Sequence, residues 1–439
     1  MQTGLPVQVP YLLASIPAED SPKSSRFCTL CVNFGLEGNI LALKDLFARG
    51  LASPQDVSST RGYSLLRWAL YGKQYETCQF LVYAGADADY RPIAVHDDNP
   101  KNKACDFLLQ GALSIQATEY VSCLTRIEDF TEEQNFASLH KIVPGLSSLN
   151  LEQEIQKNPD SVNTTDTKGR TALQLASARG DDKAVAILLS YQADPDLLDS
   201  QFSGPLLYAA AQNHPVCLRL LLEAGANPDP PIYRKIKRGN PLNVATRLGS
   251  DPLVIKTLLD FSANVESCGA KGRTSLLHAA LNDDVAVAAL LLEYNANINA
   301  KSSTTQTPLT AAITHNSHNV LQLLLDRWQE YSTCPHLHGP NLLQLAAFYG
   351  DLETMKILIG VGHFALSYDK NYVASNFATR LRDRRDVSEE LINAFADLLS
   401  VIDIQPQNEV KEILAESGLL RQDSDSDVFL IAKEYTDQK

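Results

Sequence analysis

The sequence predicts an all-α solenoid of about nine stacked helix pairs with a helical cap at its carboxyl end. Two observations support this prediction: an anchor leucine recurs every 33–36 residues, and each interval holds two short apolar helical stretches separated by a turn. The anchors, each three residues before an alanine, are Leu173, Leu206, Leu242, Leu276, Leu309 and Leu343. This period indicates a repeat array, because such a pair buries its apolar faces only against neighbouring copies.

The clearest unit is residues 169–199, GRTALQLASARGDDKAVAILLSYQADPDLLD. Leu173 and Ala176 lie on one apolar helical face, and Gly180 ends that helix. A second apolar helix then includes Leu188 and Leu189, and similar pairs follow in the other units. We therefore expect each repeat to be a helix, a tight turn and an antiparallel helix.

At this period the sequence resembles the ankyrin repeat family, whose repeats carry GxTPLHxA followed by LLxxGAD. The matching stretches are AGADAD (84–89), GRTAL (169–173), AGANPD (224–229), GRTSLLHAA (272–280) and TPLTAA (307–312). The wider arrangement over roughly residues 26–400 is similar to a group of fungal ankyrin-repeat proteins. The resemblance implies β-turn fingers between the helix pairs and a concave face, lined by fingers and first helices, that binds other proteins.

The repeat register divides the chain into five predicted parts. Residues 1–24 form a flexible leader, 25–135 divergent repeats with an insertion, 136–365 regular repeats, 366–400 a helical cap and 401–439 an acidic, partly disordered tail. Leu66 and Leu139 are two repeat lengths and about seven residues apart, so one further helix pair must lie between them. Helical spacing at 103–109 and 115–127 predicts that pair.

Composition indicates a soluble monomer inside the cell. The formal net charge is −14, which argues against nucleic acid as the main ligand. The eight cysteines are irregularly spaced, as in a reducing compartment, and the N-terminus has no secretory pattern. No apolar run reaches the length that crosses a bilayer. The expected location is the cytoplasm, with the nucleus as the alternative.

Catalytic, cofactor and metal sites are not expected. Cys28 and Cys31 form a CxxC without further ligands nearby, so helix packing is the favoured interpretation. The run from Cys334 to His338 is richer in ligands but lies at a repeat boundary. His140 and His278 match the buried histidine that, in the family, bonds the adjoining loop. These patterns predict a non-enzymatic protein.

The expected concave face is basic in this acidic chain. Six repeats place 30 residues on it, where the chain's composition would put about four acids, and none is Asp or Glu. Its bases are Lys168, Arg170, Arg179, Lys237, Arg247, Lys271 and Arg273. Because charge complementarity steers and selects partners, the pattern predicts an acidic protein segment as the ligand. The alternative is that these bases only solvate the rim.

Aromatic rings near the ends of the array complete the expected site. Tyr63, Tyr71, Phe348 and Tyr349 are interpreted as exposed anchors for binding energy. The leading functional prediction is thus a protein-interaction scaffold with a concave, locally basic surface.

A second function depends on two short motifs. RKIKR (234–238) resembles a nuclear import signal, and DSDSDVFLI (423–431) resembles a SUMO-interacting strand beside acids. Both have simpler readings, a solvated loop and a disordered tail. Together they support the alternative of a nuclear regulatory protein.

Overall fold

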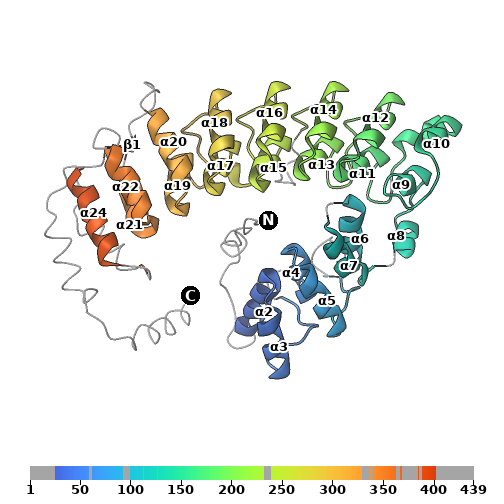
Figure 1. Cartoon of the computed structure of the whole chain (residues 1–439), viewed down its shortest axis with the longest axis horizontal. Helices are drawn as coiled ribbons and strands as arrows, with labels where there is room; N and C mark the ends of the chain where they lie inside the picture. The colour runs from blue at the N-terminus through green and yellow to red at the C-terminus, as the bar shows by residue number, and fades with distance from the viewer. Residues whose placement is uncertain are drawn as a thin grey trace. The chain divides into compact units, whose positions relative to one another are not determined.

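The computed structural model describes residues 25–401, except 59–61, 92–98, 112, 126, 232–238, 329–336, 339, 362–365, 368–383 and 385–387. Helices dominate this part of the chain (Figure 1). The described residues belong to two compact units, an N-terminal unit that ends at Asp194 and a C-terminal unit that begins at Pro195. Each unit is described by itself below.

The described residues of the N-terminal unit form five helix pairs and one additional helix. The pairs are α2 (Ser25–Glu37) with α3 (Ile40–Ala48), α4 (Leu65–Tyr71) with α5 (Tyr75–Tyr83), α6 (Pro100–Gln110) with α7 (Ile115–Ser122), α9 (Ser138–Ile142) with α10 (Leu151–Lys157), and α11 (Ala172–Arg179) with α12 (Asp182–Ser190). Helix α8 (Ile127–Glu133) precedes α9, and a 3₁₀ turn, η1 (Pro159–Asn163), follows α10.

The part of the C-terminal unit that the structure describes forms five further pairs and one last helix. The pairs are α13 (Pro205–Ala211) with α14 (Pro215–Glu223), α15 (Pro241–Leu248) with α16 (Pro252–Asp260), α17 (Ser275–Asn282) with α18 (Val285–Glu293), α19 (Pro308–His315) with α20 (His318–Trp328), and α21 (Pro340–Tyr349) with α22 (Leu352–Val361). A 3₁₀ turn, η2 (Ala270–Gly272), precedes α17. Segments β1 (Leu337–His338) and β2 (Leu366–Ser367) pair in parallel. Helix α24 (Glu389–Val401) follows.

The predicted all-α solenoid architecture is confirmed. The described residues contain ten helix pairs, close to the nine or so expected. Neighbouring first helices pack in sequence, α13 on α15, α15 on α17, α17 on α19 and α19 on α21 (Figure 1). All six anchor leucines are buried, none with more than 3% of its surface exposed. The period therefore reflects one core position repeated along the chain.

Local signals at the helix ends explain the sharp repeat boundaries. Thr171 and Gln174 form a reciprocal capping box at the start of α11, and Gly180 ends that helix at φ 71°. Thr307 and Thr310 form the same box at the start of α19. The finger before α11 is a small hairpin, since Thr165 and Thr171 form an antiparallel bridge. These caps satisfy backbone groups that short helices leave open.

The extra pair predicted between Leu66 and Leu139 is present as α6 and α7. Helix α8 was not predicted, and α9 is only five residues long, against eight for α11. Helix α6 packs directly against α11, although about 65 residues separate them along the chain (Figure 1). Thus the N-terminal unit departs from simple stacking at α8 and α9.

The end of the C-terminal unit is covered by α24, which packs on α22. Phe395, Leu398 and Leu399 of α24 are buried, and none has more than 1% of its surface exposed. A terminal helix of this kind shields the apolar face that the last repeat would otherwise present to water. Among the described helices, none is both long enough and apolar enough to cross a bilayer.

Candidate protein-binding surface

Two fingers, one in each unit, carry the same pair of bases at the same repeat positions. Lys168 and Arg170 precede their anchor leucine by five and three residues, as Lys271 and Arg273 precede theirs. In the first finger the backbone N–H of Asp166 donates to the carbonyl of Arg170 at 2.9 Å. In the second, the N–H of Gly269 donates to the carbonyl of Arg273, also at 2.9 Å. The two turns therefore have the same closure and differ at their first residue.

In the N-terminal unit, the finger bases bind a carboxylate of the same chain. Arg170 Nη1 lies 2.7 Å from Asp106 Oδ1, and Lys168 Nζ lies 2.8 Å from Asp106 Oδ2. Arg170 Nε also donates to Asp166 Oδ2 at 2.8 Å. We call these four residues the carboxylate clamp. Asp106 comes from α6, so the clamp joins α6 to the finger before α11.

The expectation that Arg170 lies on an exposed groove is wrong, because the clamp buries it to 4% exposure. Arg179 is half-buried and donates to the carbonyl of Leu109 at 2.8 Å, at the end of α6. Arg179 therefore caps α6, whose last residue is followed by Gly111 at φ 67°. All three predicted bases of this unit are engaged by α6.

Helix α6 contributes part of the surface that a longer α9 would supply to α11. In the C-terminal unit, α15 alone makes two contacts to the next repeat: Asn243 Nδ2 donates to the carbonyl of Arg273 at 2.8 Å, and the carbonyl of Thr246 accepts from Asn282. In the N-terminal unit, the two equivalent contacts to α11 come from two different helices, α9 and α6. His140 Nε2 of α9 bonds the carbonyl of Arg170 at 2.8 Å, whereas α6 provides the carbonyls capped by Arg179.

Two buried groups link the stability of the N-terminal unit to pH. Burial lowers the pKa of His140 below 6.5, although the bond to the Arg170 carbonyl and the charge of Asp166 act in the other direction. Burial alone would raise the pKa of Asp106, but the charges of Arg170, Lys168 and Lys103 hold it below 3.8. Because each pKa is lower in the folded state, each group stabilises the fold above its unfolded pKa and loses that contribution on acidification.

We expect the free energy of unfolding of this unit to fall in two ranges as the pH is lowered. The first decrease begins near pH 6.5, where His140 becomes protonated in the unfolded chain but not in the folded one. The second begins near pH 3.8, where Asp106 becomes protonated in the unfolded chain but not in the folded one. Urea titrations can follow the fluorescence of Trp68, which is buried in α4, in a Trp328→Phe background that removes the other tryptophan. His140→Asn should remove the decrease in the free energy of unfolding that begins near pH 6.5. Asp106→Asn should remove the decrease that begins near pH 3.8. Unchanged profiles would contradict this assignment.

In the C-terminal unit, the second finger has no carboxylate of its own at the first position. Gly269 stands where Asp166 stands in the clamp, and Lys271 is exposed. Arg273 is half-buried, with Nη2 3.5 Å from Gln306 Oε1, and Arg247 is exposed on α15. Burial, followed by the charges of Arg247 and Arg273, lowers the pKa of His278 to about 3. The bases thus create a positive environment around α15 and α17.

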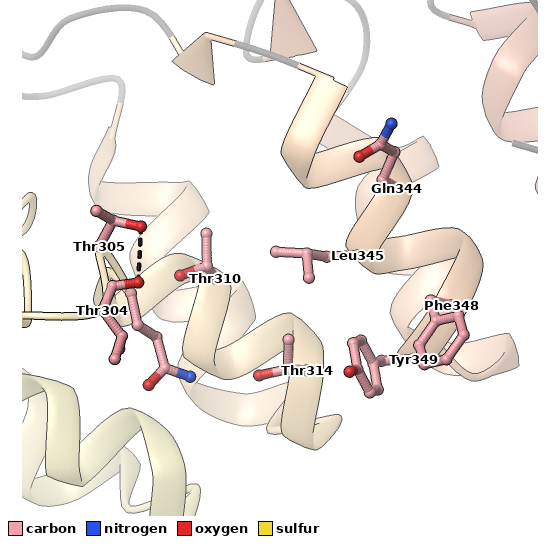
Figure 2. A pocket seen from close by; sticks show the side chains of 9 residues that line it. Thr304, Thr305, Thr310, Thr314, Gln344, Leu345, Phe348 and Tyr349 are labelled. Carbon is pink, nitrogen blue, oxygen red and sulfur yellow. Dashed lines mark hydrogen bonds between the residues drawn. The ribbon is translucent and has the colours of Figure 1, made fainter. Parts of the chain in front are cut away.

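A groove lies beside this finger, between α19 and α21. Its volume is about 560 Å³. It is lined by Thr304, Thr305, Gln306, Thr310, Thr314, Gln344, Leu345, Phe348 and Tyr349. Figure 2 shows Leu345 and Tyr349 of α21 opposite Thr310 and Thr314 of α19. We call this feature the threonine groove.

The surface that the threonine groove presents to a ligand is mainly apolar, because threonine hydroxyls in it donate to carbonyls of their own helix. The hydroxyl of Thr310 donates to the Thr307 carbonyl at 3.0 Å, and that of Thr314 to the Ala311 carbonyl at 3.0 Å. Phe348 and Tyr349 pack edge to face, with ring centroids 4.6 Å apart. Tyr349 is 44% exposed. These two predicted anchors are therefore together at one site.

The other two predicted rings lie apart in the N-terminal unit. Tyr63 is 4% exposed, so its expected exposure is wrong; its ring packs against Trp68 at 5.4 Å and stacks on Tyr71. Tyr71 is 45% exposed, and the guanidinium of Arg67 lies over both tyrosine rings. These contacts indicate that the aromatic cluster packs α4 into the unit, and that Tyr71 lies at the exposed edge of the cluster.

Several other predicted features lie outside the described residues. They are Lys237 with the 234–238 motif, the 423–431 tail motif, and most of the run from Cys334 to His338. Cys31 is buried in α2, as its packing interpretation requires. Within the described part, no cluster of three or more His, Cys, Asp or Glu side chains is arranged to hold a metal ion.

Comparison with known proteins identifies the repeats. The family profile described as ankyrin repeats (3 copies) matches residues 139–232, and that described as ankyrin repeats (many copies) matches residues 276–325. The chain carries ankyrin repeats. These two regions include the first finger, the carboxylate clamp except Asp106, and the α19 side of the threonine groove. Lys271 and Arg273 of the second finger lie just before the second matched region.

Relatives share parts of this array. The chain is 27% identical over 215 residues to the palmitoyltransferase AKR1 of Saccharomyces cerevisiae, which is 48% of this chain and 27% of the relative. It is 41% identical over 64 residues to human ankyrin repeat domain-containing protein 63, or 15% of this chain and 17% of the relative. It is 30% identical over 131 residues to the chicken nuclear factor NF-kappa-B p105 subunit, which is 29% of this chain and 13% of the relative. The chain thus spans about a quarter or less of these relatives' lengths.

Proposed function

We propose that this chain is a non-enzymatic scaffold that binds a partner protein through the inner face of its C-terminal unit. One observation carries the proposal: the threonine groove adjoins the finger of Lys271 and Arg273, which touches it through Gln306. The site combines exposed aromatic surface with cationic side chains. Aromatic anchors supply much of the energy in protein interfaces, and complementary charge selects the partner.

The lining of the groove supports binding rather than catalysis. Its nine side chains are threonine, glutamine, leucine, phenylalanine and tyrosine, without a His, Cys, Asp, Glu or Lys. General acid–base or nucleophilic catalysis needs such groups within hydrogen-bond reach of each other. One relative is named a palmitoyltransferase, but the match covers 27% of that protein. We therefore propose recognition of a partner, not acyl transfer, as the task of this chain.

The nuclear alternative stays a prediction. Its two motifs, residues 234–238 and 423–431, lie outside the described residues, and its further support is the similarity to a protein named as a nuclear factor subunit. The surface proposed above serves either a cytoplasmic or a nuclear partner.

The proposal is tested by truncating the exposed ring of the groove. Tyr349→Ala is expected to weaken partner binding by about 2 kcal/mol, or roughly 30-fold, because it removes a central aromatic anchor. Affinity purification with quantitative mass spectrometry, from cells expressing the tagged chain, measures the loss. Tyr83→Ala is the matched control, since Tyr83 is 77% exposed and belongs to the other unit. Equal recovery of all partners by both variants would refute the groove as the binding surface.

A further inference from the structure

The carboxylate clamp shows which group the repeated finger bases bind. Lys168 and Arg170 hold the two oxygens of one carboxylate, with Nζ–Oδ2 and Nη1–Oδ1 distances of 2.8 and 2.7 Å. Arg170 has a second carboxylate, Asp166, in its own turn. Bases at these two finger positions can therefore receive a carboxylate that a neighbouring helix presents.

The equivalent finger of the C-terminal unit keeps both bases and changes the residues around them. Gly269 replaces the carboxylate of Asp166. The preceding first helix offers Asn243, which donates to the Arg273 carbonyl as His140 of α9 bonds the Arg170 carbonyl. The next finger approaches closely, because the backbone N–H of Ser303 donates to the carbonyl of Lys271 at 2.8 Å. The bases thus stand at the edge of the threonine groove.

We propose that the finger of Lys271 and Arg273 binds an aspartate or glutamate side chain of a partner protein, as the first finger binds Asp106, and that an apolar side chain of the same segment enters the threonine groove. This inference rests on the proposed function and specifies the partner's chemistry. The partner segment is acidic at one position and aromatic or aliphatic at another. The environment of His278, dominated by burial and by the charges of Arg247 and Arg273, agrees with a site that attracts an anion.

The distance between the two contacts sets the spacing in the partner. The finger before α17 and helix α21 are two repeats apart, and packed helices lie about 8–10 Å from each other, which gives about 20 Å. An extended chain advances roughly 3.3 Å per residue, so about six residues separate the acid from the apolar anchor. The bound segment would cross α19 between them.

A peptide rather than nucleic acid is the occupant that the site favours. The internal ligand of the first finger is a carboxylate, and the groove beside the second finger is apolar with self-bonded hydroxyls. Nucleic-acid binding uses an extended set of phosphate contacts and a basic surface, whereas this chain has a net charge of −14. DNA binding is therefore an outcome to be measured against the proposal.

The test is selection of a displayed library of random 16-residue peptides on the full chain. The expected result is enrichment of peptides with Asp or Glu about six residues from Phe, Tyr, Trp or Leu. Fluorescence titration of a selected peptide should show at least about tenfold weaker binding to Lys271→Glu/Arg273→Glu, because two attractive charges become repulsive. Lys271→Glu alone, at an exposed position, provides a second variant that leaves the half-buried Arg273 in place.

The matched control is Arg219→Glu/Lys256→Glu, which makes the same change of charge at exposed positions of the second helices α14 and α16. It should bind the selected peptide within about twofold of the unchanged chain. Selected peptides without an acid, equal loss in the control, or binding of a 20-base-pair DNA duplex that the finger variants abolish would overturn this inference. A library that yields no peptide sensitive to Tyr349→Ala would instead count against the proposed function.

Discussion

Asp106→Leu is expected to destabilise the N-terminal unit by about 3 kcal/mol or more, because it leaves Lys168 and Arg170 without the carboxylate that both hold. Arg170 keeps its contact with Asp166, so the loss should fall toward the lower end of the range for a broken buried ion pair. Asp106→Asn should cost less, since its amide oxygen still accepts a hydrogen bond. Urea unfolding followed by Trp68 fluorescence in the Trp328→Phe background measures both.

The control for this substitution is Asp129→Leu, which makes the same change at an exposed position of α8. Its effect should stay within about 0.5 kcal/mol, as for surface substitutions generally. If Asp106→Leu were as mild as the control, the clamp would contribute no stability. The attachment of α6 to α11 would then depend on apolar packing and on the hydrogen bond from Arg179 to the Leu109 carbonyl.

Phe395→Ala is expected to destabilise the end of the C-terminal unit by about 3–5 kcal/mol, since Phe395 is fully buried where α24 covers α22. In a repeat array the loss concentrates at the affected end, because each repeat is stabilised by its direct neighbours. Hydrogen–deuterium exchange should therefore accelerate first in α24 and α22. Helices α13–α18 should remain protected.

Asp397→Ala is the appropriate comparison for Phe395→Ala, because Asp397 lies on the exposed side of the same helix. Its exchange pattern should match that of the unchanged chain. Uniform acceleration across the whole C-terminal unit by Phe395→Ala would show that the unit unfolds as one block. The interpretation of α24 as a local cap would then be wrong.

The repeat architecture could be predicted from the sequence because it follows from local, recurring signals. The anchor leucines recur at a nearly fixed period and mark one core position. A threonine caps the first helices α11, α17 and α19, and a glycine ends α11 and α15. His140 was also predicted correctly as a buried histidine that bonds the neighbouring loop. Such features depend on adjacent repeats, which the period already aligns.

The engagement of Arg170 was missed because its partner lies 64 residues away along the chain. The offsets that placed Lys168 and Arg170 on the inner face carry no information about what α6 presents to them. One signal was available: Asp106 is a single acid between Cys105 and Phe107 in an otherwise apolar helical turn. A buried acid requires a cationic partner, and the basic fingers were the candidates. Tyr63 was misjudged for a different reason, since the residue that covers it, Trp68, is only five positions away along the chain.

The broken stacking at α9 limits where this array can be divided. Solenoids usually tolerate the loss of terminal repeats, because each repeat is stabilised by contacts with its immediate neighbours. Here a fragment that begins just before α9 would keep His140 but lose the carbonyl acceptors of Arg179 and the carboxylate of Asp106. A fragment that keeps both of these contacts must begin at or before Asn99, which caps the start of α6.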